Sequence, residues 1–233
     1  MASGAVYIHA LRYQWLNCLY DPVVRVTTRE TAVKQALIGL LPPIEHGEFL
    51  DLACGTGTLT RAIKSAVPDA AVRGIDGDRD MLVRARGNAL TANLEVDYDH
   101  GLAQQLPYAD DSFDVVTSSL FFHHLSSEGK RAAFREIRRV LKPAGTVLIA
   151  DWGRPQNKLQ RILFVLVQLV DGFETTDDNL RGLLPGMLEA AGFSAPQLIR
   201  NMMTPLGTIA IIRASECGPG VANNVERSSE GKS

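Results

Sequence analysis

The segment FLDLACGTGTLT, residues 49–60, joins a short apolar run to a glycine-rich turn and then to a helical pattern. Glycines at such a turn allow a ligand to come close to the backbone. In open α/β sheets, ligands bind at the carboxyl ends of the strands, near the point where the strand order reverses. The segment therefore predicts where the ligand site lies, and its residue types indicate what the ligand is.

Apolar runs of strand length alternate with helical patterns along most of the chain. The expected strands cover residues 49–53, 70–76, 94–100, 113–120 and 145–152. The expected helices cover 57–67, 78–90 and 126–142, with a shorter one near 103–106. This alternation predicts an α/β fold, a Rossmann-like doubly wound sheet that is mostly parallel and covered on both faces.

Two further strand-like runs follow the last of these helices. They cover residues 193–203 and 206–214 and are separated by Thr204 and Pro205 alone. Such a short connection is typical of a hairpin, which joins antiparallel strands. We therefore expect an antiparallel strand at the C-terminal end of the sheet.

The bulk composition is that of a globular domain. The chain has 233 residues, of which 45% are hydrophobic and 21% charged, enough for one substantial core. The formal net charge is −2, which gives no indication of a nucleic-acid partner. We expect a small molecule as the partner, and the composition leaves both a monomer and a homodimer open.

Cysteine use and apolar run length bear on the compartment. Cys18, Cys54 and Cys217 are far apart and form no C-x-x-C pair, which argues against a disulfide scaffold and a structural zinc site. The longest apolar stretch, Ile162–Val170, is far below the roughly 20 residues needed to cross a bilayer. With no signal-peptide pattern at the start, we expect a cytoplasmic protein without a transmembrane segment or a bound metal, while peripheral membrane contact stays open.

The expected domain organisation is simple. Residues 1–214 form a single domain, in which about 1–43 are helical and about 155–192 are an insertion before the final hairpin. Residues 215–233 are rich in Gly, Ser, Asn and charge and have almost nothing to bury, so we expect a disordered tail there.

The spacing of the glycines excludes two common phosphate ligands. A nucleoside triphosphate loop has four residues between its glycines, followed by Lys, whereas Gly55 and Gly57 are one residue apart with no Lys after them. A dinucleotide site needs a third glycine where Thr60 stands, and that glycine allows close packing of helix on strand.

Two acidic residues favour a cationic nucleoside instead. Asp76 follows the second expected strand, where a carboxylate can accept hydrogen bonds from both ribose hydroxyls. Asp51 comes just before the turn, where it would repel a pyrophosphate and attract an ammonium group. A ligand with both a ribose and a cation is S-adenosylmethionine.

Four ordered motifs carry a resemblance to a known family. They are LACGTG at 52–57, GIDGDRDML at 74–82, GLAQQLPYADDSFDVVTSSLFFHHL at 101–125 and EIRRVLKPAGTVLIADW at 136–152. Over residues 20–214 the chain resembles the class I S-adenosylmethionine-dependent methyltransferases, in particular the small-molecule branch that contains the quinone-biosynthesis C-methyltransferases. The resemblance implies S-adenosylmethionine as the cofactor and S-adenosylhomocysteine as its product.

The resemblance also implies which residues line the cofactor site. They share a position at or just after the carboxyl ends of the first four strands. From the methionine part through the ribose and the adenine to the sulfonium they are Asp51, Ala53, Gly55, Gly57, Asp76, Gly77, Met81, Leu102, Ala103, Ser118 and Ser119.

Three of these positions depart from the family pattern. Ala53 stands where glycine is common, and Gly77 where a larger apolar residue often packs on the adenine. Leu102 stands where an Asp commonly accepts a hydrogen bond from the adenine amino group, which leucine cannot do. We still expect cofactor binding, with a looser adenine pocket.

His123 and Asp151 are the candidate catalytic residues. Both follow strands whose ends border the expected methyl group, so His123 can act as a base and Asp151 can orient it. Each residue also has a simpler interpretation, packing or capping of the next helix. His124 is adjacent to His123, and we expect only one of the two rings to face the pocket.

These patterns predict an S-adenosylmethionine-dependent methyltransferase that acts on a small, apolar or aromatic acceptor. They do not separate O-, C-, N- and S-methylation. Two alternatives stay open, a non-catalytic S-adenosylmethionine-binding protein and a nicotinamide-dependent oxidoreductase. The second is disfavoured by Asp51 and Thr60.

Overall fold

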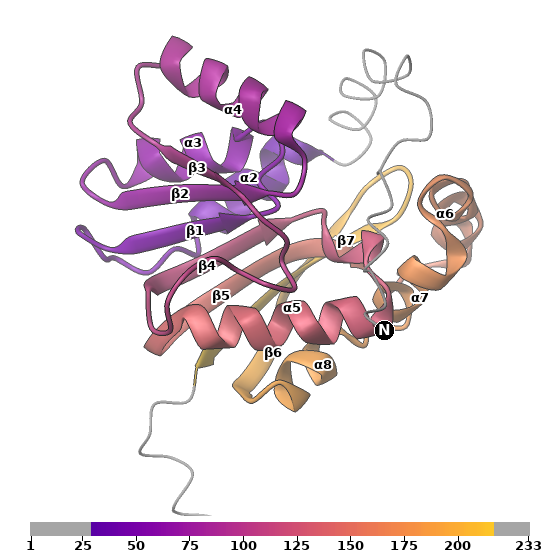
Figure 1. Cartoon of the computed structure of the whole chain (residues 1–233). Helices are drawn as coiled ribbons and strands as arrows, with labels where there is room; N and C mark the ends of the chain where they lie inside the picture. Colours follow the sequence, from indigo (N-terminus) through magenta and orange to yellow (C-terminus); the bar gives the residue numbers. More distant parts are fainter. Residues whose placement is uncertain (1–28, 217–233) are drawn as a thin grey trace, which may run out of the picture.

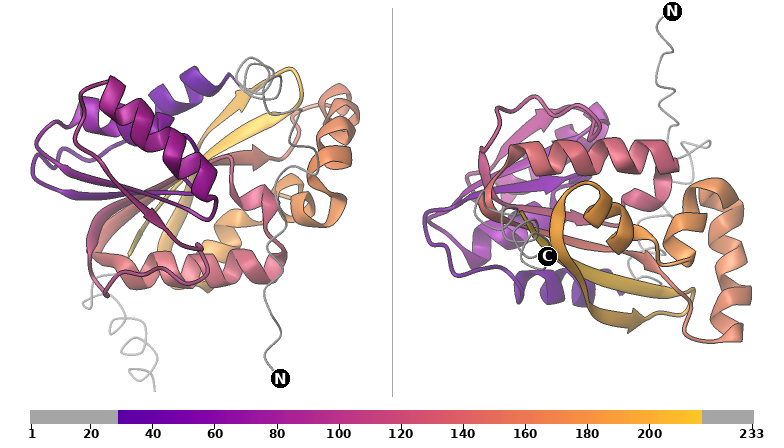
Figure 2. Two further views of the ribbon diagram at one scale, coloured as in Figure 1. Left: turned by 45° about the horizontal axis from the view of Figure 1, so that its top comes forward. Right: turned by 90° about the horizontal axis from the view of Figure 1, so that it is seen from below.

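The computed structural model describes residues 29–216, which form a seven-stranded sheet with helices on both faces (Figures 1 and 2). The strand order is β3-β2-β1-β4-β5-β7-β6. The strands are β1 (Glu48–Leu52), β2 (Ala71–Asp76), β3 (Asp97–His100), β4 (Phe113–Ser119), β5 (Leu141–Gly153), β6 (Phe193–Met203) and β7 (Thr208–Glu216).

β1 carries the apolar run of the opening segment, and the strand order reverses beside it. It pairs in parallel with β2 on one side and with β4 on the other. All of its residues except Glu48 are buried, because helices cover both faces of the sheet here. The turn after β1 therefore lies at the position where ligands of this fold class bind.

The helices form one layer on each side of the sheet. They are α2 (Glu30–Ile38), α3 (Thr58–Ala66), α4 (Arg79–Thr91), the short 3₁₀ helix η2 (Phe122–His124), α5 (Ser127–Val140), α6 (Lys158–Asp171), α7 (Phe173–Leu180) and α8 (Leu184–Ala190). Apolar side chains of α5 and α8 pack on one face, and those of α2, α3 and α6 on the other. The doubly wound α/β fold predicted from the alternation is confirmed.

The closing hairpin is antiparallel, as expected. β7 runs antiparallel to both β5 and β6. The connection is longer than the two residues expected, because the turn comprises residues 204–207. The backbone N–H of Thr204 donates to the carbonyl oxygen of Gly207 at 2.8 Å, and the Gly207 N–H donates to the Thr204 hydroxyl at 3.1 Å.

Three expected boundaries were wrong. No helix forms near 103–106, where Leu102 and Gln105 instead pair across a tight turn. β3 begins at Asp97 rather than at residue 94. β7 continues to Glu216, so the first two residues of the expected tail belong to the sheet. The remaining tail, residues 217–233, and residues 1–28 of the expected N-terminal helices lie outside the described residues.

The expected insertion holds α6, α7 and α8. In α6, Phe164 is buried and packs edge-on against Trp152, with ring centroids 5.1 Å apart. The opposite side of α6 exposes a row of large apolar side chains at Leu159, Ile162, Leu166 and Leu169. Among the described residues, no helix is long and apolar enough to span a membrane.

A buried lysine attaches the insertion to the rest of the domain. Lys130, on α5, is fully buried, and its Nζ donates to the Thr175 carbonyl oxygen at 2.6 Å and to Asp178 Oδ2 at 3.1 Å. The Ser127 hydroxyl donates to the same Asp178 oxygen at 2.6 Å. Burial would lower the pKa of Lys130, and the Asp178 carboxylate compensates part of that cost.

We predict that Lys130→Ala lowers the free energy of unfolding by about 3–5 kcal/mol, because it leaves Asp178 buried without its cation. Urea unfolding measures this loss. Arg131→Ala is the matched control, since Arg131 is exposed on the same helix and should change stability by less than about 0.5 kcal/mol. A loss from Lys130→Ala no larger than that of the control would contradict the anchoring role.

Candidate functional site

The turn after β1 alternates between left-handed and ordinary backbone. Ala53, Gly55 and Gly57 have φ values of 56°, 53° and 71°. The left-handed region costs a residue with a Cβ about 1–2 kcal/mol, so Ala53 is strained where its two companions are not. This strain accounts for the glycine that the resembling family commonly has at the position of Ala53.

The two glycines of the turn have different structural roles. A Cβ on Gly55 would meet nothing within 4 Å, so this side of the loop is open to a ligand. A Cβ on Gly57 would collide with the hydroxyl of Tyr98, a buried side chain of β3. Gly57 is therefore required by packing, and Gly55 is the residue that leaves room for a ligand.

Asp51 is buried beneath the turn. It accepts hydrogen bonds from the hydroxyls of Thr60 at 2.6 Å and Thr117 at 3.3 Å. Burial raises the pKa of Asp51 to about 6, although these hydroxyls and the charge of Lys34 partly offset the shift. Thr60, read from the sequence only as a missing glycine, is thus a partner of the key carboxylate.

Asp76 holds the turn after β2 against the turn after β1. Its Oδ2 accepts from the Gly55 N–H and its Oδ1 from the Asp78 N–H, both at 2.8 Å. Each carboxylate oxygen has a further lone pair, so both can still accept a ligand hydroxyl. Burial raises the pKa of Asp76.

The residues expected around the adenine lie in neighbouring loops. Gly77 and Met81 follow β2, in the turn and the first turn of α4, while Leu102 and Ala103 follow β3. The Gly101 N–H donates to the Asp76 carbonyl oxygen at 3.1 Å, which links the two loops. Ala103 is buried, whereas Leu102 is 39% exposed.

The two serines at the end of β4 differ. The Ser118 hydroxyl donates to the Leu52 carbonyl oxygen at 3.1 Å and is fully buried within the sheet. The Ser119 hydroxyl is buried without a hydrogen-bond partner within residues 29–216. Ser119 is therefore the one available to a ligand.

Asp151, at the end of β5, caps the short helix η2. Its Oδ2 accepts from the backbone N–H groups of Phe121 at 3.0 Å and Phe122 at 2.6 Å, and its Oδ1 accepts from the Trp152 N–H at 2.7 Å. The simple interpretation of Asp151 as a capping residue is therefore correct.

Asp151 also orients His123. Its Oδ1 is 2.7 Å from His123 Nδ1, and both side chains are almost fully buried. The Asn179 amide of α7 donates to the same oxygen at 3.2 Å. Because a carboxylate only accepts, Nδ1 carries the proton and the Nε2 lone pair of neutral His123 faces away from Asp151.

Charge and burial act in opposite directions on these groups. Burial would lower the pKa of His123, but the charges of Asp151 and Asp171 outweigh it and raise the pKa above its usual value. Burial would raise the pKa of Asp151, but His123 and the backbone donors lower it. Asp151 therefore stays ionised and His123 is the stronger proton acceptor of the pair.

Both histidines face the same carboxylate, which corrects the expectation that only one could face the pocket. The compact 3₁₀ turn of η2 places the two rings 3.9 Å apart, between centroids. Asp171, the last residue of α6, lies 3.7 Å from His123 Nε2 and 4.0 Å from His124 Nδ1. Burial and the charge of His123 lower the pKa of His124 to about 3.

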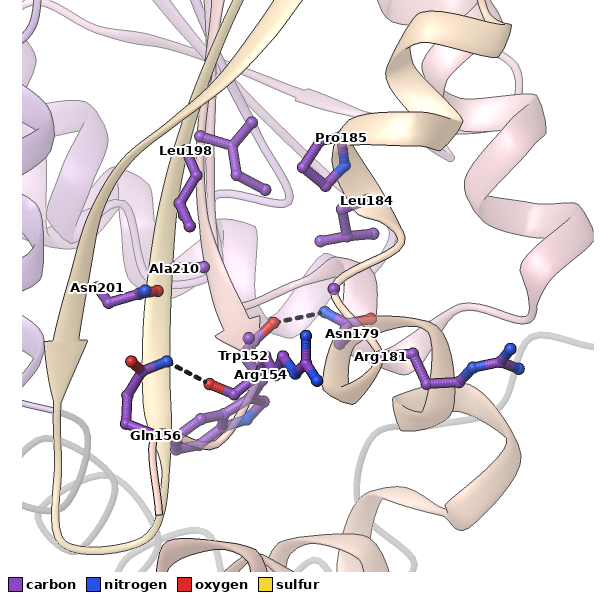
Figure 3. A pocket seen from close by; sticks show the side chains of 13 residues that line it. Trp152, Arg154, Gln156, Asn179, Arg181, Leu184, Pro185, Leu198, Asn201 and Ala210 are labelled. Atoms are coloured by element: carbon purple, nitrogen blue, oxygen red, sulfur yellow. Dashed lines mark hydrogen bonds between the residues drawn. The ribbon is translucent and has the colours of Figure 1, made fainter.

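A cavity of about 210 Å³ lies beside the end of β5 (Figure 3). Leu184, Leu198 and Ile212 are among its apolar lining residues. Asn179 also lines it and donates to both Asp151 and the Trp152 carbonyl oxygen, so it separates the cavity from the His123–Asp151 pair. The sequence gave no indication of Asn179 or Asp171, since both belong to the insertion.

The residues of the β1–β2 side fit S-adenosylmethionine. The turn leaves room at Gly55, two carboxylates face it from Asp51 and Asp76, and the Ser119 hydroxyl is unpaired among the described residues. Carboxylates attract an ammonium or sulfonium group and accept from ribose hydroxyls, whereas they would repel a pyrophosphate.

Comparison with known proteins agrees with this donor set. Residues 49–145 match a family described as a methyltransferase domain. The chain is 33% identical over 207 residues to a demethylmenaquinone methyltransferase of Thermus thermophilus, covering 85% of this chain and 88% of that protein. It is 30% identical to an uncharacterized methyltransferase of Synechocystis, covering 87% and 92%.

Solved structures share the fold. A SAM-dependent methyltransferase from Aquifex aeolicus superposes with a TM-score of 0.62 at 19% identity, covering 89% of this chain and 99% of that chain. The YcgJ protein from Bacillus subtilis gives a TM-score of 0.64 at 20% identity, covering 80% and 99%.

We predict that affinity for S-adenosylhomocysteine, which carries the same amino group as the methyl donor, falls as the pH drops below about 6. Asp51 has a raised pKa of about 6 in the free protein, so it becomes neutral there and no longer attracts the ammonium group. The loss should approach tenfold per pH unit. Calorimetric titration from pH 5 to 8 measures it.

Asp51→Asn should weaken binding at pH 7.5 and remove this pH dependence. Asp69→Asn, at an exposed position, is the control and should keep both the affinity and its slope. An affinity that is flat over this pH range, or a slope that survives Asp51→Asn, would show that the carboxylate does not bind the amino group.

A second prediction concerns the turn itself. Gly57→Ala should destabilise the protein by more than the about 1–2 kcal/mol of a left-handed residue, because the added Cβ meets the Tyr98 hydroxyl. Tyr98→Phe alone should cost little, since that hydroxyl has no partner among residues 29–216. In the double variant, Tyr98→Phe should restore more than about 0.5 kcal/mol, measured by urea unfolding, whereas strict additivity would argue against the collision.

Proposed function

The chain belongs to the class I S-adenosylmethionine-dependent methyltransferases, and we propose that its acceptor is an apolar aromatic molecule with an ionisable hydroxyl group, such as a quinol. The observation that carries the proposal is the buried His123–Asp151 pair, with Nδ1 2.7 Å from Oδ1. Methyl acceptors that carry an acidic proton need a base, and this pair leaves His123 Nε2 free to serve as one.

The methyl donor would be held by the β1–β2 half of the site. Asp51 would attract its ammonium group, Asp76 would accept from its ribose, and the loop at Gly55 would admit it. When bound, S-adenosylmethionine supplies a methyl group on a sulfonium that needs no further activation. The protein then contributes mainly by positioning the two reactants and by managing the proton.

His123 would receive the proton of the acceptor hydroxyl at Nε2. The electron pair left on the acceptor then forms the new bond to the methyl carbon, either from the oxygen or from a ring carbon made nucleophilic by the ionised oxygen. In the second case the ring also releases a C–H proton. Asp151 would keep the ring of His123 in place and stabilise the imidazolium that forms.

The apolar character of the acceptor has two supports. The site is bordered by Phe121 and Trp152, and the cavity beside Asn179 has an apolar lining. The Thermus relative is a demethylmenaquinone methyltransferase, an enzyme named for an apolar quinone. We therefore expect a reduced naphthoquinone to be a better acceptor than a thiol, an amine or a carboxylate.

Transfer of a labelled methyl group to a panel of acceptors tests the proposal. The panel contains a demethylated naphthoquinol, a simple phenol, an alkyl thiol and a primary amine. We expect transfer to the naphthoquinol first, with the phenol next, and mass spectrometry of the product separates a C-methyl from an O-methyl group. Transfer to the thiol or amine alone would contradict the proposal.

His123→Gln should lower turnover by about 10²–10⁴-fold, the usual contribution of a general base. Affinity for S-adenosylhomocysteine should change less than about twofold, because His123 lies on the acceptor side. His46→Gln, in an exposed loop, is the matched control and should behave as the wild type. Wild-type turnover of His123→Gln on the best acceptor would exclude the base.

A further inference from the structure

The carboxylate of Asp171 lacks the partners that a buried charge normally has. Its side chain is 8% exposed, and neither oxygen accepts a hydrogen bond within the described residues. A buried carboxylate without donors or a cation costs several kcal/mol, so proteins rarely leave one unpaired. Burial accordingly raises the pKa of Asp171.

Two imidazole nitrogens face this carboxylate at a distance unsuited to hydrogen bonding. His123 Nε2 lies 3.7 Å from Oδ2, and His124 Nδ1 lies 4.0 Å from Oδ1. A shared proton would bring such atoms to about 2.7–2.9 Å. The observed distances are instead close to the about 3.4 Å that separates two ligands of one tetrahedral ion with bonds of about 2.1 Å.

The three ligand atoms form one cluster. All lie within 4.8 Å of one another, close enough for a single ion to reach each after a small inward movement. His123 and His124 come from η2, whereas Asp171 ends α6, so the cluster joins the main domain to the insertion.

Asp151 completes the arrangement from behind. Histidines that bind metal ions almost always donate their other ring N–H to a carboxylate or carbonyl, which fixes the tautomer. His123 donates from Nδ1 to Asp151 at 2.7 Å, so its Nε2 lone pair faces the cluster. Asp151 is itself held by backbone donors of Phe121 and Phe122, which makes the orientation of the ring rigid.

We propose that His123 Nε2, His124 Nδ1 and the Asp171 carboxylate bind a divalent transition-metal ion, with Zn²⁺ as the best fit. Two imidazoles and one carboxylate suit Zn²⁺, Co²⁺ and Ni²⁺, whereas Mg²⁺ and Ca²⁺ prefer oxygen ligands. Three protein ligands leave a fourth tetrahedral position open. The sequence gave no reason to expect this site, because its cysteines exclude only a thiolate one.

One consequence rests on the proposed function. If His123 is the base, an ion on Nε2 occupies the lone pair that would take the proton of the acceptor. Zn²⁺ would then inhibit methyl transfer reversibly, and a chelator would restore it. Binding of the ion to the protein alone does not depend on this role.

Metal binding is tested on the full-length protein after treatment with a chelator and its removal. Calorimetric titration with Zn²⁺ should give one site per chain, and Co²⁺ should give the visible absorption of a tetrahedral ion. Asp171→Asn and His124→Gln should each weaken Zn²⁺ binding by more than about 100-fold, at least the effect of losing an outer-shell partner. His46→Gln should leave it unchanged, and thermal unfolding of all variants shows that they are folded.

Two results would overturn the site: no stoichiometric binding of Zn²⁺ or Co²⁺, or equal affinity in the wild type, Asp171→Asn and His124→Gln. The inhibition assay separates this proposal from the proposed function. Stoichiometric binding without any inhibition would support the metal site and exclude His123 as the base. Absence of binding together with an inactive His123→Gln variant would exclude the metal site and support the base.

Discussion

The carboxylate of Asp151 is the contact on which the acceptor side of the molecule depends. It accepts hydrogen bonds from three backbone N–H groups, the imidazole of His123 and the amide of Asn179. These donors come from η2, from the end of β5 and from α7, so one buried charge fixes three separate segments. Each donor also lowers the energy of the ionised form, which keeps the carboxylate charged although it is fully buried.

The donor side is organised around a second buried carboxylate with the opposite balance. Asp51 has only two hydroxyl partners, so burial dominates and its pKa rises to about 6. Many donors stabilise a charge in advance, whereas few donors leave the charge in need of a cation. The two aspartates therefore serve different purposes: Asp151 is satisfied by the protein itself and acts as a scaffold, while Asp51 has capacity left for a ligand.

Local patterns in the sequence predicted the sheet and the donor side, because their determinants lie within a few residues of one another. The run around Asp51, the glycines of the turn and the hairpin at Thr204 are of this kind. The expected helix near 103–106 failed, since the segment around Leu102 closes on itself as a turn. Asp171 and Asn179 could not be identified, because their contacts with His123 and Asp151 join positions 28 to 48 residues apart in the chain.

The position of the insertion follows from two features that lie away from the site. Lys130 ties α7 to α5 through Thr175 and Asp178, which places Asn179 against Asp151. Gly172, with a φ of 99°, turns the chain sharply between α6 and α7, so that Asp171 ends α6 beside η2. The β1 turn determines the methyl donor irrespective of these contacts. A methyltransferase with the same turn and another insertion would therefore keep its donor and lose the surroundings of His123, which is where acceptor chemistry is decided.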